Sequence, residues 1–539
     1  MTHRRESLDK WEAARRCSTR FTRNEDGSLI AFSLFIFVAM LMFGGIAVDL
    51  MIYENERTHI QNSTDRAVLA AANLNQTVDP KLVVQDHLAK VGIQVDPDDI
   101  NVVEVGTAPV ITGRQVSVSV SGAYNTMLMN LVGVEQLTFS AMSEAEESVN
   151  DIEVSLVLDV SGSMGWNSKL ENMQVAAKDF VDNILAGAAD DRVSLSLVPY
   201  STQVSAGPEL LALLNKTHSH GFSHCVNFDT VDFRRTDIDH GSPLSQTAHF
   251  DPWRNYRYGR SLQYPVCRNE EYFHIRPWSN NAEALKDQID DFEADGNTSI
   301  DIAMKWGTAL LDPSMNSQLN GLIANPSVEI DTAFSVRPHA YTYADSLKFI
   351  VLMTDGINTD QPYLENAYKT GNSPYARHPD SGDIYMRREE PGDRDRDGRW
   401  GEDWYNVSDR RWENSPFDDD EPGIALSWPE AWASMTMSWR AYAEYHQSYD
   451  ADDYYDALYG PRRWVDAETK DDRLDDICDA AKAKGIVVFT IGFEVTDHSA
   501  DVMRSCASTP NHFYRVEGLD IEYAFASIAN QINQLKLTQ

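Results

Sequence analysis

One carboxylate and two hydroxyl groups stand at alternate positions directly after an apolar run. Residues 154–158 form this run, and the motif Asp159-x-Ser161-x-Ser163 follows it. A strand covered on both faces is apolar without alternation, so the run is typical of a central strand in a parallel sheet. Glycines on either side of the last serine allow a tight turn, and a helical pattern comes next. The motif is therefore expected at the carboxyl end of a strand, where open α/β sheets bind their ligands.

Two further oxygen-bearing side chains are expected at the same edge of the sheet. Thr298 stands at the start of a helical pattern, and Asp355 ends a second apolar run. Hard oxygen donors without Cys or His favour Mg²⁺, or alternatively Mn²⁺ or Ca²⁺. The sequence thus predicts a metal site made of Asp159, Ser161, Ser163, Thr298 and Asp355. The alternative is a capped turn in which a serine only hydrogen-bonds the following helix, but such a cap does not require the distant Thr and Asp.

The elements that position these residues alternate along the chain. Four apolar runs, separated by helical patterns, occur at 154–158, 192–200, 346–356 and 485–493. Alternating strands and helices predict an α/β fold with a doubly wound parallel sheet. Two long stretches, at about 201–281 and 358–470, interrupt the alternation and are expected to be insertions in one domain. The second is rich in Trp and Tyr, which either form a sticky exposed surface or a small core of their own.

One segment near the N-terminus has the length and composition of a membrane span. Residues 29–48 are almost wholly apolar, which suffices for a helix to cross a bilayer. Arginines and a lysine precede the run and acidic residues follow it, so the N-terminus is expected in the cytoplasm and the bulk of the chain outside. A cleaved secretory signal is the rival, but the run is long for one and no small-residue cleavage site follows it.

The sequence therefore divides into four parts. They are a cytoplasmic tail (1–26), a transmembrane helix and stalk (27–74), a small α/β unit (75–150) and the domain with the predicted metal site (151–539). In the stalk, Arg57, Gln61 and Asp65 recur at i+4 spacing as a polar stripe beside a face of small residues that could pack on a neighbour. The small unit begins with a helical pattern at 80–92, and an alternating strand follows at 114–126.

Four of the five cysteines lie beyond the span, in what would be an oxidising compartment. Four cysteines permit three pairings, and sequence proximity favours Cys225 with Cys267 and Cys478 with Cys506. The alternative is four buried free thiols. A zinc site is less favoured, because a CxxC pair does not occur in the sequence.

Charge excludes one class of partner. The formal net charge is −37, and affinity for a phosphate backbone comes from Lys and Arg, so nucleic acid is not expected to bind. In the second insertion Asp393, Asp395 and Asp397 are spaced like the start of a calcium loop. Position 12 of that loop is Trp404 rather than Glu, so a solvated charged loop is the default and Ca²⁺ the alternative.

The motif with its distant Thr and Asp resembles the metal-ion-dependent adhesion site of von Willebrand factor A domains. The resemblance implies that Ser161, Ser163 and Thr298 bind the metal directly, with Asp159 and Asp355 often acting through water. Neutral hydroxyls leave much of the ion's charge uncancelled, so a carboxylate of a partner protein is expected in an open coordination position.

The N-terminal segment is similar to the segment that opens TadE/TadG-type components of tight adherence (Tad, or Flp) pilus machines. The matching positions are Gly27, Gly45, Ala47, Val48, Asp49, Arg57, Gln61, Asp65, Ala67 and 69–71. A single span, a small α/β unit and a C-terminal A domain together resemble the TadG type. This implies a protein of the bacterial inner membrane that holds a pilus subunit or an envelope component in the periplasm.

Two other functions remain as alternatives. One is a membrane-anchored A domain of a chaperone or assembly complex unrelated to pili. The other is a metal-assisted hydrolase, which would need a base or nucleophile beside the metal. Histidine does not accompany the motif strands and the serines are assigned as metal ligands, so an enzyme is not expected.

Overall fold

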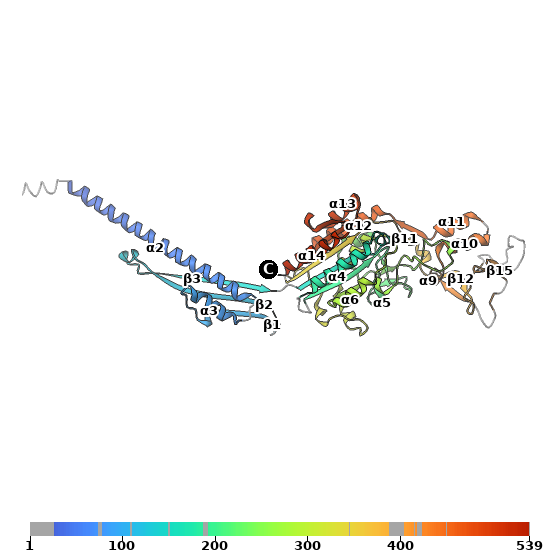
Figure 1. Ribbon diagram of the computed structural model, residues 1–539, viewed down its shortest axis with the longest axis horizontal. Coiled ribbons are helices and arrows are strands. Elements are labelled where there is room, and N and C mark those ends of the chain that lie inside the picture. Colours follow the sequence, from blue (N-terminus) through green and yellow to red (C-terminus); the bar gives the residue numbers. More distant parts are fainter. Residues whose placement is uncertain are drawn as a thin grey trace, which may run out of the picture. The chain divides into compact units, whose positions relative to one another are not determined.

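The chain forms two compact units, which divide between Val149 and Asn150. Figure 1 shows the helices and strands of both units. The computed structural model describes residues 26–73, 78–107, 110–148, 151–186, 192–343, 345–387, 404–413, 416–417, 423–448 and 450–537.

The first unit consists of a long helix, a short helix and an antiparallel sheet with the strand order β1-β2-β3. The elements are α2 (Asp26–Ala72), α3 (Pro80–Lys90), β1 (Ile100–Thr107), β2 (Val110–Asn125) and β3 (Gln136–Ser148). The second half of α2 packs on the sheet and on α3 through a core that includes Val68, Val84, Val118 and Ala141. The small-residue face of the stalk therefore packs within its own unit.

The first half of α2 is apolar and exposed. Leu29, Phe35 and Phe43 each expose 70% or more of their surface. Among the described residues one helix is long and apolar enough to cross a membrane, and its apolar stretch lies in this region. By length and composition, α2 is compatible with a single-pass anchor.

Asp49 joins this helix to the tip of the β2–β3 hairpin. Its carboxylate is fully buried and accepts hydrogen bonds from the backbone N–H groups of Met127, Leu128 and Met129 at 3.1, 2.7 and 2.6 Å, and from the Tyr124 hydroxyl at 3.1 Å. The Met129 N–H opens the short helix η2 (Met129–Val132), whose unpaired N–H groups suit an anion.

Three other positions that resemble the TadE/TadG segment, Gly45, Gln61 and Asp65, also contact the hairpin. A Cβ atom on Gly45 would lie 2.8 Å from Cβ of Leu128, so the close approach requires glycine. Further along the helix, Gln61 donates to Asp65 and to the Ser143 hydroxyl of β3, at 2.9 and 3.0 Å. Gln61 and Asp65 of the polar stripe predicted on the stalk therefore face the sheet of their own unit, whereas Arg57 is exposed and pairs with Glu54 of the same helix.

The second unit contains a six-stranded sheet with the order β19-β18-β10-β4-β5-β9, and all neighbours are parallel except β9, which is antiparallel to β5. In chain order the strands are β4 (Asp151–Asp159), β5 (Val193–Tyr200), β9 (Arg276–Ser279), β10 (Ser346–Thr354), β18 (Val487–Phe493) and β19 (Phe513–Val516). This confirms the predicted doubly wound sheet.

Helices cover both faces of this sheet (Figure 1), so its central strands are buried on both sides. Leu156 and Val351 point to one face, where α4 (Lys169–Leu185), α6 (Ala282–Asp290) and α14 (Asp520–Leu537) pack. Val157 and Ile350 point to the other face. The helices there are α7 (Ile300–Ala309), α8 (Asn316–Ile323), α12 (Ala467–Ala483) and α13 (Asp497–Cys506).

The first insertion contains little regular secondary structure. It holds α5 (Gly207–Ala212) and a sheet of three short strands, β6 (Lys216–Thr217), β7 (Val226–Asn227) and β8 (Leu244–Gln246). The sequence predicted that this insertion extends to about residue 281. Residues 276–279 instead form the edge strand β9 of the main sheet.

The second insertion forms a small core of its own. Its strands are β11 (Gln361–Leu364), β12 (Asn372–Arg377), β13 (Ile384–Arg387), β14 (Trp404–Asn406), β15 (Arg411–Glu413), β16 (Ile424–Ser427) and β17 (Arg462–Val465), and its helices are α9 (Trp428–Ser434), α10 (Met437–Ser448) and α11 (Ala451–Tyr459). Trp428, Trp432 and Tyr375 are buried together, and Phe250 and Val266 of the first insertion join them. Many of the aromatic side chains therefore build a core rather than an exposed surface.

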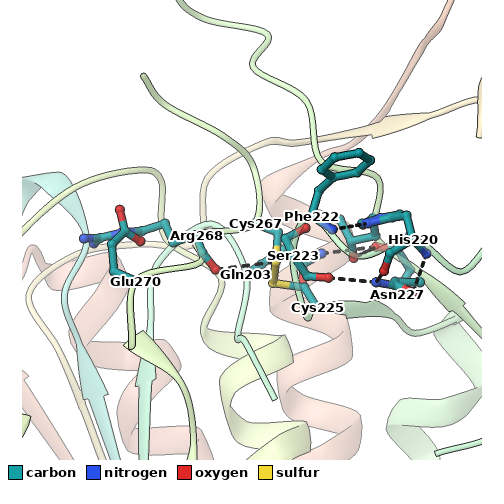
Figure 2. Close-up of a disulfide and its surroundings, with 11 residues drawn as sticks. Gln203, His220, Phe222, Ser223, Cys225, Asn227, Cys267, Arg268 and Glu270 are labelled. Atoms are coloured by element: carbon teal, nitrogen blue, oxygen red, sulfur yellow. Dashed lines mark hydrogen bonds and ion pairs between the residues drawn. A yellow bond between two sulfur atoms is a disulfide. The ribbon is translucent and has the colours of Figure 1, made fainter. Parts of the chain in front are cut away.

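Both proposed disulfides are present in the structure. Cys225 is joined to Cys267, with an S–S distance of 2.00 Å, and Cys478 is joined to Cys506, at 1.92 Å. Figure 2 shows the first bond within the first insertion, with the side chain of Arg268 next to it. All four cysteines are fully buried.

Candidate metal site

The five predicted metal ligands come from three separate segments at the carboxyl edge of the main sheet. Asp159 is the last residue of β4. Ser161 directly precedes the turn η3 (Gly162–Gly165), and Ser163 lies within it. Thr298 lies two residues before the start of α7, and Asp355 follows β10 directly. Because β4 and β10 are adjacent parallel strands, their ends meet at one edge.

Hydrogen bonds and close packing bring these side chains together. The Ser163 hydroxyl donates to Oδ1 of Asp355 at 2.6 Å, and the hydroxyl oxygens of Ser161 and Ser163 are 3.3 Å apart. A Cβ atom on Gly356 would lie 3.8 Å from Oγ of Ser163 and 3.9 Å from Oγ1 of Thr298. Glycine at position 356 therefore keeps the space between these hydroxyls open.

The turn of the motif also depends on a close backbone approach. The N–H of Gly162 donates to the carbonyl of Gly296 at 3.0 Å, and a Cβ atom on Gly162 would lie 3.2 Å from that oxygen. Gly296 itself has φ +84°, a conformation that side chains rarely adopt. The two glycines hold the serines of the motif beside the loop that carries Thr298.

Asp159 is fully buried and held on both oxygens. The backbone N–H of Ser161 donates to Oδ1 at 2.8 Å, and the Thr354 hydroxyl donates to Oδ2 at 2.8 Å. Burial and the neighbouring Asp355 carboxylate raise the pKa of Asp159 to about 7. A divalent cation would relieve this repulsion, so the electrostatics fit a cation site.

Lys169 is a residue of the site that sequence reasoning missed. Its ammonium nitrogen lies 3.0 Å from Oδ2 of Asp355 and 3.8 Å from Oε2 of Glu494, and the side chain is almost completely buried. Lys169 is the first residue of α4, where the helix dipole disfavours a cation. The signal in the sequence is a lysine at the start of a predicted helix, where a cation needs a carboxylate partner.

The loop that carries Thr298 is held by Lys470, which sequence reasoning also missed. The buried ammonium group donates to the carbonyls of Thr298 and Thr359 at 2.8 and 2.7 Å, and to the Ser299 hydroxyl at 2.7 Å. Asn358 accepts from the N–H of Ile300 at 2.8 Å, which satisfies a donor at the start of α7.

The donor set suits a hard cation. It offers three hydroxyls and two carboxylates, which are the oxygen ligands that Mg²⁺, Mn²⁺ and Ca²⁺ prefer. In the part of the chain that the structure describes, His, Cys, Asp and Glu form no cluster of three or more suited to a metal, and this site has two such residues, Asp159 and Asp355. The candidate calcium loop with Asp393, Asp395 and Asp397 lies outside the described residues.

The fold and the site together define a doubly wound α/β domain that places an Asp-x-Ser-x-Ser motif at the carboxyl edge of its parallel sheet. At the other end of the chain, residues 27–74 match the family model described as putative Flp pilus-assembly TadE/G-like. The matched stretch is the helix α2 and the residues just after it. The N-terminal segment is thus TadE/G-like.

Solved structures with a likeness to the chain include a von Willebrand factor domain and a pilus adhesin. The vWF domain of the type V pili tip protein Mfa5 from Porphyromonas gingivalis is 13% identical; the match covers 72% of this chain and 98% of that domain, with a TM-score of 0.32. The pilus adhesin SpaC from Lactobacillus rhamnosus GG is 12% identical, with coverage of 82% and 35% and a TM-score of 0.28.

A third likeness is to proximal thread matrix protein 1 of the mussel byssus, solved with zinc in its MIDAS motif. It is 9% identical, the match covers 71% of this chain and 46% of that protein, and the TM-score is 0.26. All three likenesses are distant. A comparison with curated proteins found no match.

Proposed function

We propose that this protein is a TadG-type component of a Tad/Flp pilus assembly system that binds a protein partner through a divalent cation. The observation that carries the proposal is the convergence of Asp159, Ser161, Ser163, Thr298 and Asp355 at one sheet edge in a chain whose N-terminal segment is TadE/G-like. When bound, the cation supplies a positive charge to which a carboxylate of the partner can bind.

The residues of the chain prepare this site without the cation. Ser161, Ser163 and Thr298 would hold the metal, while Asp159 and Asp355 supply negative charge beside it. A hydrogen bond from Thr354 holds Asp159 in place, and one from Lys470 holds the loop that carries Thr298. In the described part of the chain, histidine makes no hydrogen bond with any of the five residues. This supports binding rather than hydrolysis, which needs a positioned base.

Retention of a partner from a periplasmic extract tests the proposal. The immobilised full chain should retain a protein in Mg²⁺ and release it when a chelator is added, and Ser163→Ala should retain less of it. Ser505→Ala is the matched control, because this exposed serine contacts Asp475 away from the site. Equal retention with Mg²⁺ and with chelator would contradict the metal-dependent mechanism.

The proposed location is the inner membrane, with the N-terminus in the cytoplasm and the bulk of the chain in the periplasm. It is supported by the basic residues before the apolar half of α2 and the acidic residues after it. A reporter that is active only in the periplasm, fused after Gln539, should be active. Activity of a cytoplasm-specific reporter at the same position would overturn the orientation.

A further inference from the structure

A cavity of about 730 Å³ lies between the two insertions and the start of α12. Its walls come from β7 and β8, from β11 and β17 and from the first residues of α12, and the five proposed metal ligands do not line it. The volume is in the range of sites that bind small molecules. Its lining includes Asp229, Ser245, Lys369, Arg463, Trp464 and Asp466, together with the ion-paired Arg235 and Arg473 and the carboxylates of Asp232 and Asp239.

Lys369, in the wall of this cavity, is a buried ammonium group without a carboxylate partner. The residue is 6% exposed, and its nitrogen donates to the Ser245 hydroxyl at 3.2 Å. Among the described residues it forms no ion pair within 4.0 Å. Burial and the Arg463 guanidinium lower the pKa of Lys369, while the carboxylates of Glu365 and Asp229 raise it from beyond ion-pair distance. A buried cation without a direct counter-ion is costly, so this position favours an anionic ligand.

Other buried lysines of this unit are satisfied by the protein. Lys305 donates to three backbone carbonyls, and Lys470 has three oxygen acceptors. Lys348 forms an ion pair with Glu153. Lys369 differs from all of them, because its one described acceptor is a neutral hydroxyl at the side of a cavity.

Arg463 adds a second cation to the same wall. Its guanidinium stands over the Tyr363 ring, 5.8 Å from the centroid, and among the described residues it forms no ion pair with a carboxylate. Trp464, the next residue of β17, keeps 46% of its surface exposed. The wall thus offers two positive charges beside a flat aromatic face, and arginine is well suited to bind a carboxylate through two parallel hydrogen bonds.

The remaining lining residues indicate what else the ligand carries. Asp229 and Asp466 are exposed carboxylates that already accept backbone N–H groups at the starts of η4 (Thr230–Arg234) and α12, and their remaining lone pairs can accept further hydrogen bonds. A ligand that also bears several hydroxyl groups could donate to them, whereas an acidic peptide would bring further carboxylates against them. A long polyanion would be repelled by the net charge of −37.

We propose that this cavity binds a carboxylated saccharide, whose carboxylate contacts Lys369 and Arg463, whose hydroxyls contact the aspartates and whose ring lies on Trp464. The site is separate from the metal site and does not depend on the function proposed for it. Its ligand class is a short sugar with uronic-acid character.

Calorimetric titration of the full chain in detergent with 1,4-linked digalacturonate tests the proposal. The acidic disaccharide should bind, and the neutral 1,4-linked galactobiose should bind at least about tenfold more weakly, because a hydrogen bond to a charged group is lost. Binding should persist in chelator. Equal affinity for both sugars, or a requirement for Mg²⁺, would overturn the assignment.

Variants separate a binding role of Lys369 from a structural one. Lys369→Met should weaken digalacturonate binding at least about tenfold without lowering the unfolding temperature, since it removes an unpaired buried charge. If this variant does not fold, Arg463→Gln on the exposed side of the wall should still weaken binding. Arg234→Gln is the matched control, because this arginine of the first insertion pairs with Asp476 outside the cavity.

Three results would refute the saccharide site. They are unchanged affinity in Arg463→Gln, an equal loss in Arg234→Gln, and tighter binding of the peptide acetyl-Glu-Glu-amide than of digalacturonate. The last result would assign the cavity to acidic peptides instead.

Discussion

Lys169 and Ser163 engage the two oxygens of one carboxylate. The Lys169 ammonium lies 3.0 Å from Oδ2 of Asp355, and the Ser163 hydroxyl donates to Oδ1 at 2.6 Å. Asp159, by contrast, is held by neutral donors, and no cation pairs with it among the described residues. A divalent ion would therefore bind at a site whose negative charge, from Asp159 and Asp355, is partly cancelled by Lys169.

Replacing this lysine should strengthen metal binding. In Lys169→Met the site loses a positive charge, and a unit charge about 4 Å away is worth about 4 kcal/mol at an effective dielectric constant of 20. Loss of the hydrogen bond that positions Asp355 opposes this gain by about 1.5–3 kcal/mol. We expect calorimetry to show tighter Mg²⁺ binding and a larger loss of thermal stability on chelation than in the wild type. Weaker Mg²⁺ binding would mean that Lys169 acts mainly by positioning Asp355.

Replacing Asp159 should abolish metal-dependent binding while the fold survives. Asp159→Ala leaves the Ser161 N–H and the Thr354 hydroxyl without their acceptor, which costs about 1–3 kcal/mol for each donor. Removal of the repulsion with Asp355 offsets part of this cost. Partner retention should fall as it does with chelator, and the two losses should not add. Ser163→Ala and Thr298→Ala should act in the same direction. Wild-type retention and normal pilus assembly in Asp159→Ala would contradict the mechanism.

The central strands and the converging site residues could be predicted because local patterns carry them. A strand such as β10 is apolar throughout since both of its faces are buried, and its end marks the position of Asp355. Short edge strands lack this signal. β9 has four residues and lies within what reads as an insertion, so its pairing with β5 comes from tertiary contacts.

The partners of the site residues could not be predicted for a related reason. Lys169 and Asp355 are separated by 186 positions, and Lys470 contacts Thr298 across 172. Pairings at such distances leave no trace in local periodicity. The cavity between the insertions is likewise invisible in the sequence, because Ser245 and Lys369 meet only in the folded chain.

The disulfide between Cys478 and Cys506 should contribute measurably to stability. It links α12 to α13 across a separation of 28 residues. Closing a loop of that length removes entropy from the unfolded chain worth about 3–4 kcal/mol. Cys478→Ala/Cys506→Ala should lower the free energy of unfolding by about that amount in urea titrations. Peptide mapping of wild-type protein without reduction should recover the 478–506 pair, and recovery of both residues as free thiols from oxidising conditions would exclude the bond.

Asp49 should determine the order of the hairpin tip in the first unit. Asp49→Ala removes the shared acceptor of the N–H groups of Met127, Leu128 and Met129. Hydrogen bonds to a charged group are worth about 1.5–3 kcal/mol, so hydrogen exchange at these amides should accelerate by about tenfold or more. Glu56→Ala is the control, because this carboxylate is exposed on the same helix. Unchanged exchange in Asp49→Ala would show that the tip is held by other contacts.

The buried Lys305 should make stability depend on pH under alkaline conditions. Its ammonium donates to the carbonyls of Asp232, Arg235 and Asp237, and burial lowers its pKa from 10.5 to about 8, although Asp232, Asp237 and Asp312 raise it and Arg235 lowers it further. Between pH 8 and 10.5 the unfolded chain binds this proton and the folded chain does not, so the free energy of unfolding rises with pH in that window.

One proton corresponds to a slope of about 1.4 kcal/mol per pH unit. Lys305→Met should reduce the slope in urea titrations by about that amount, whereas Lys286→Met, at a partly exposed lysine whose pKa is raised by Asp182, should not. An identical slope in Lys305→Met and the wild type would show that Lys305 stays protonated throughout this range.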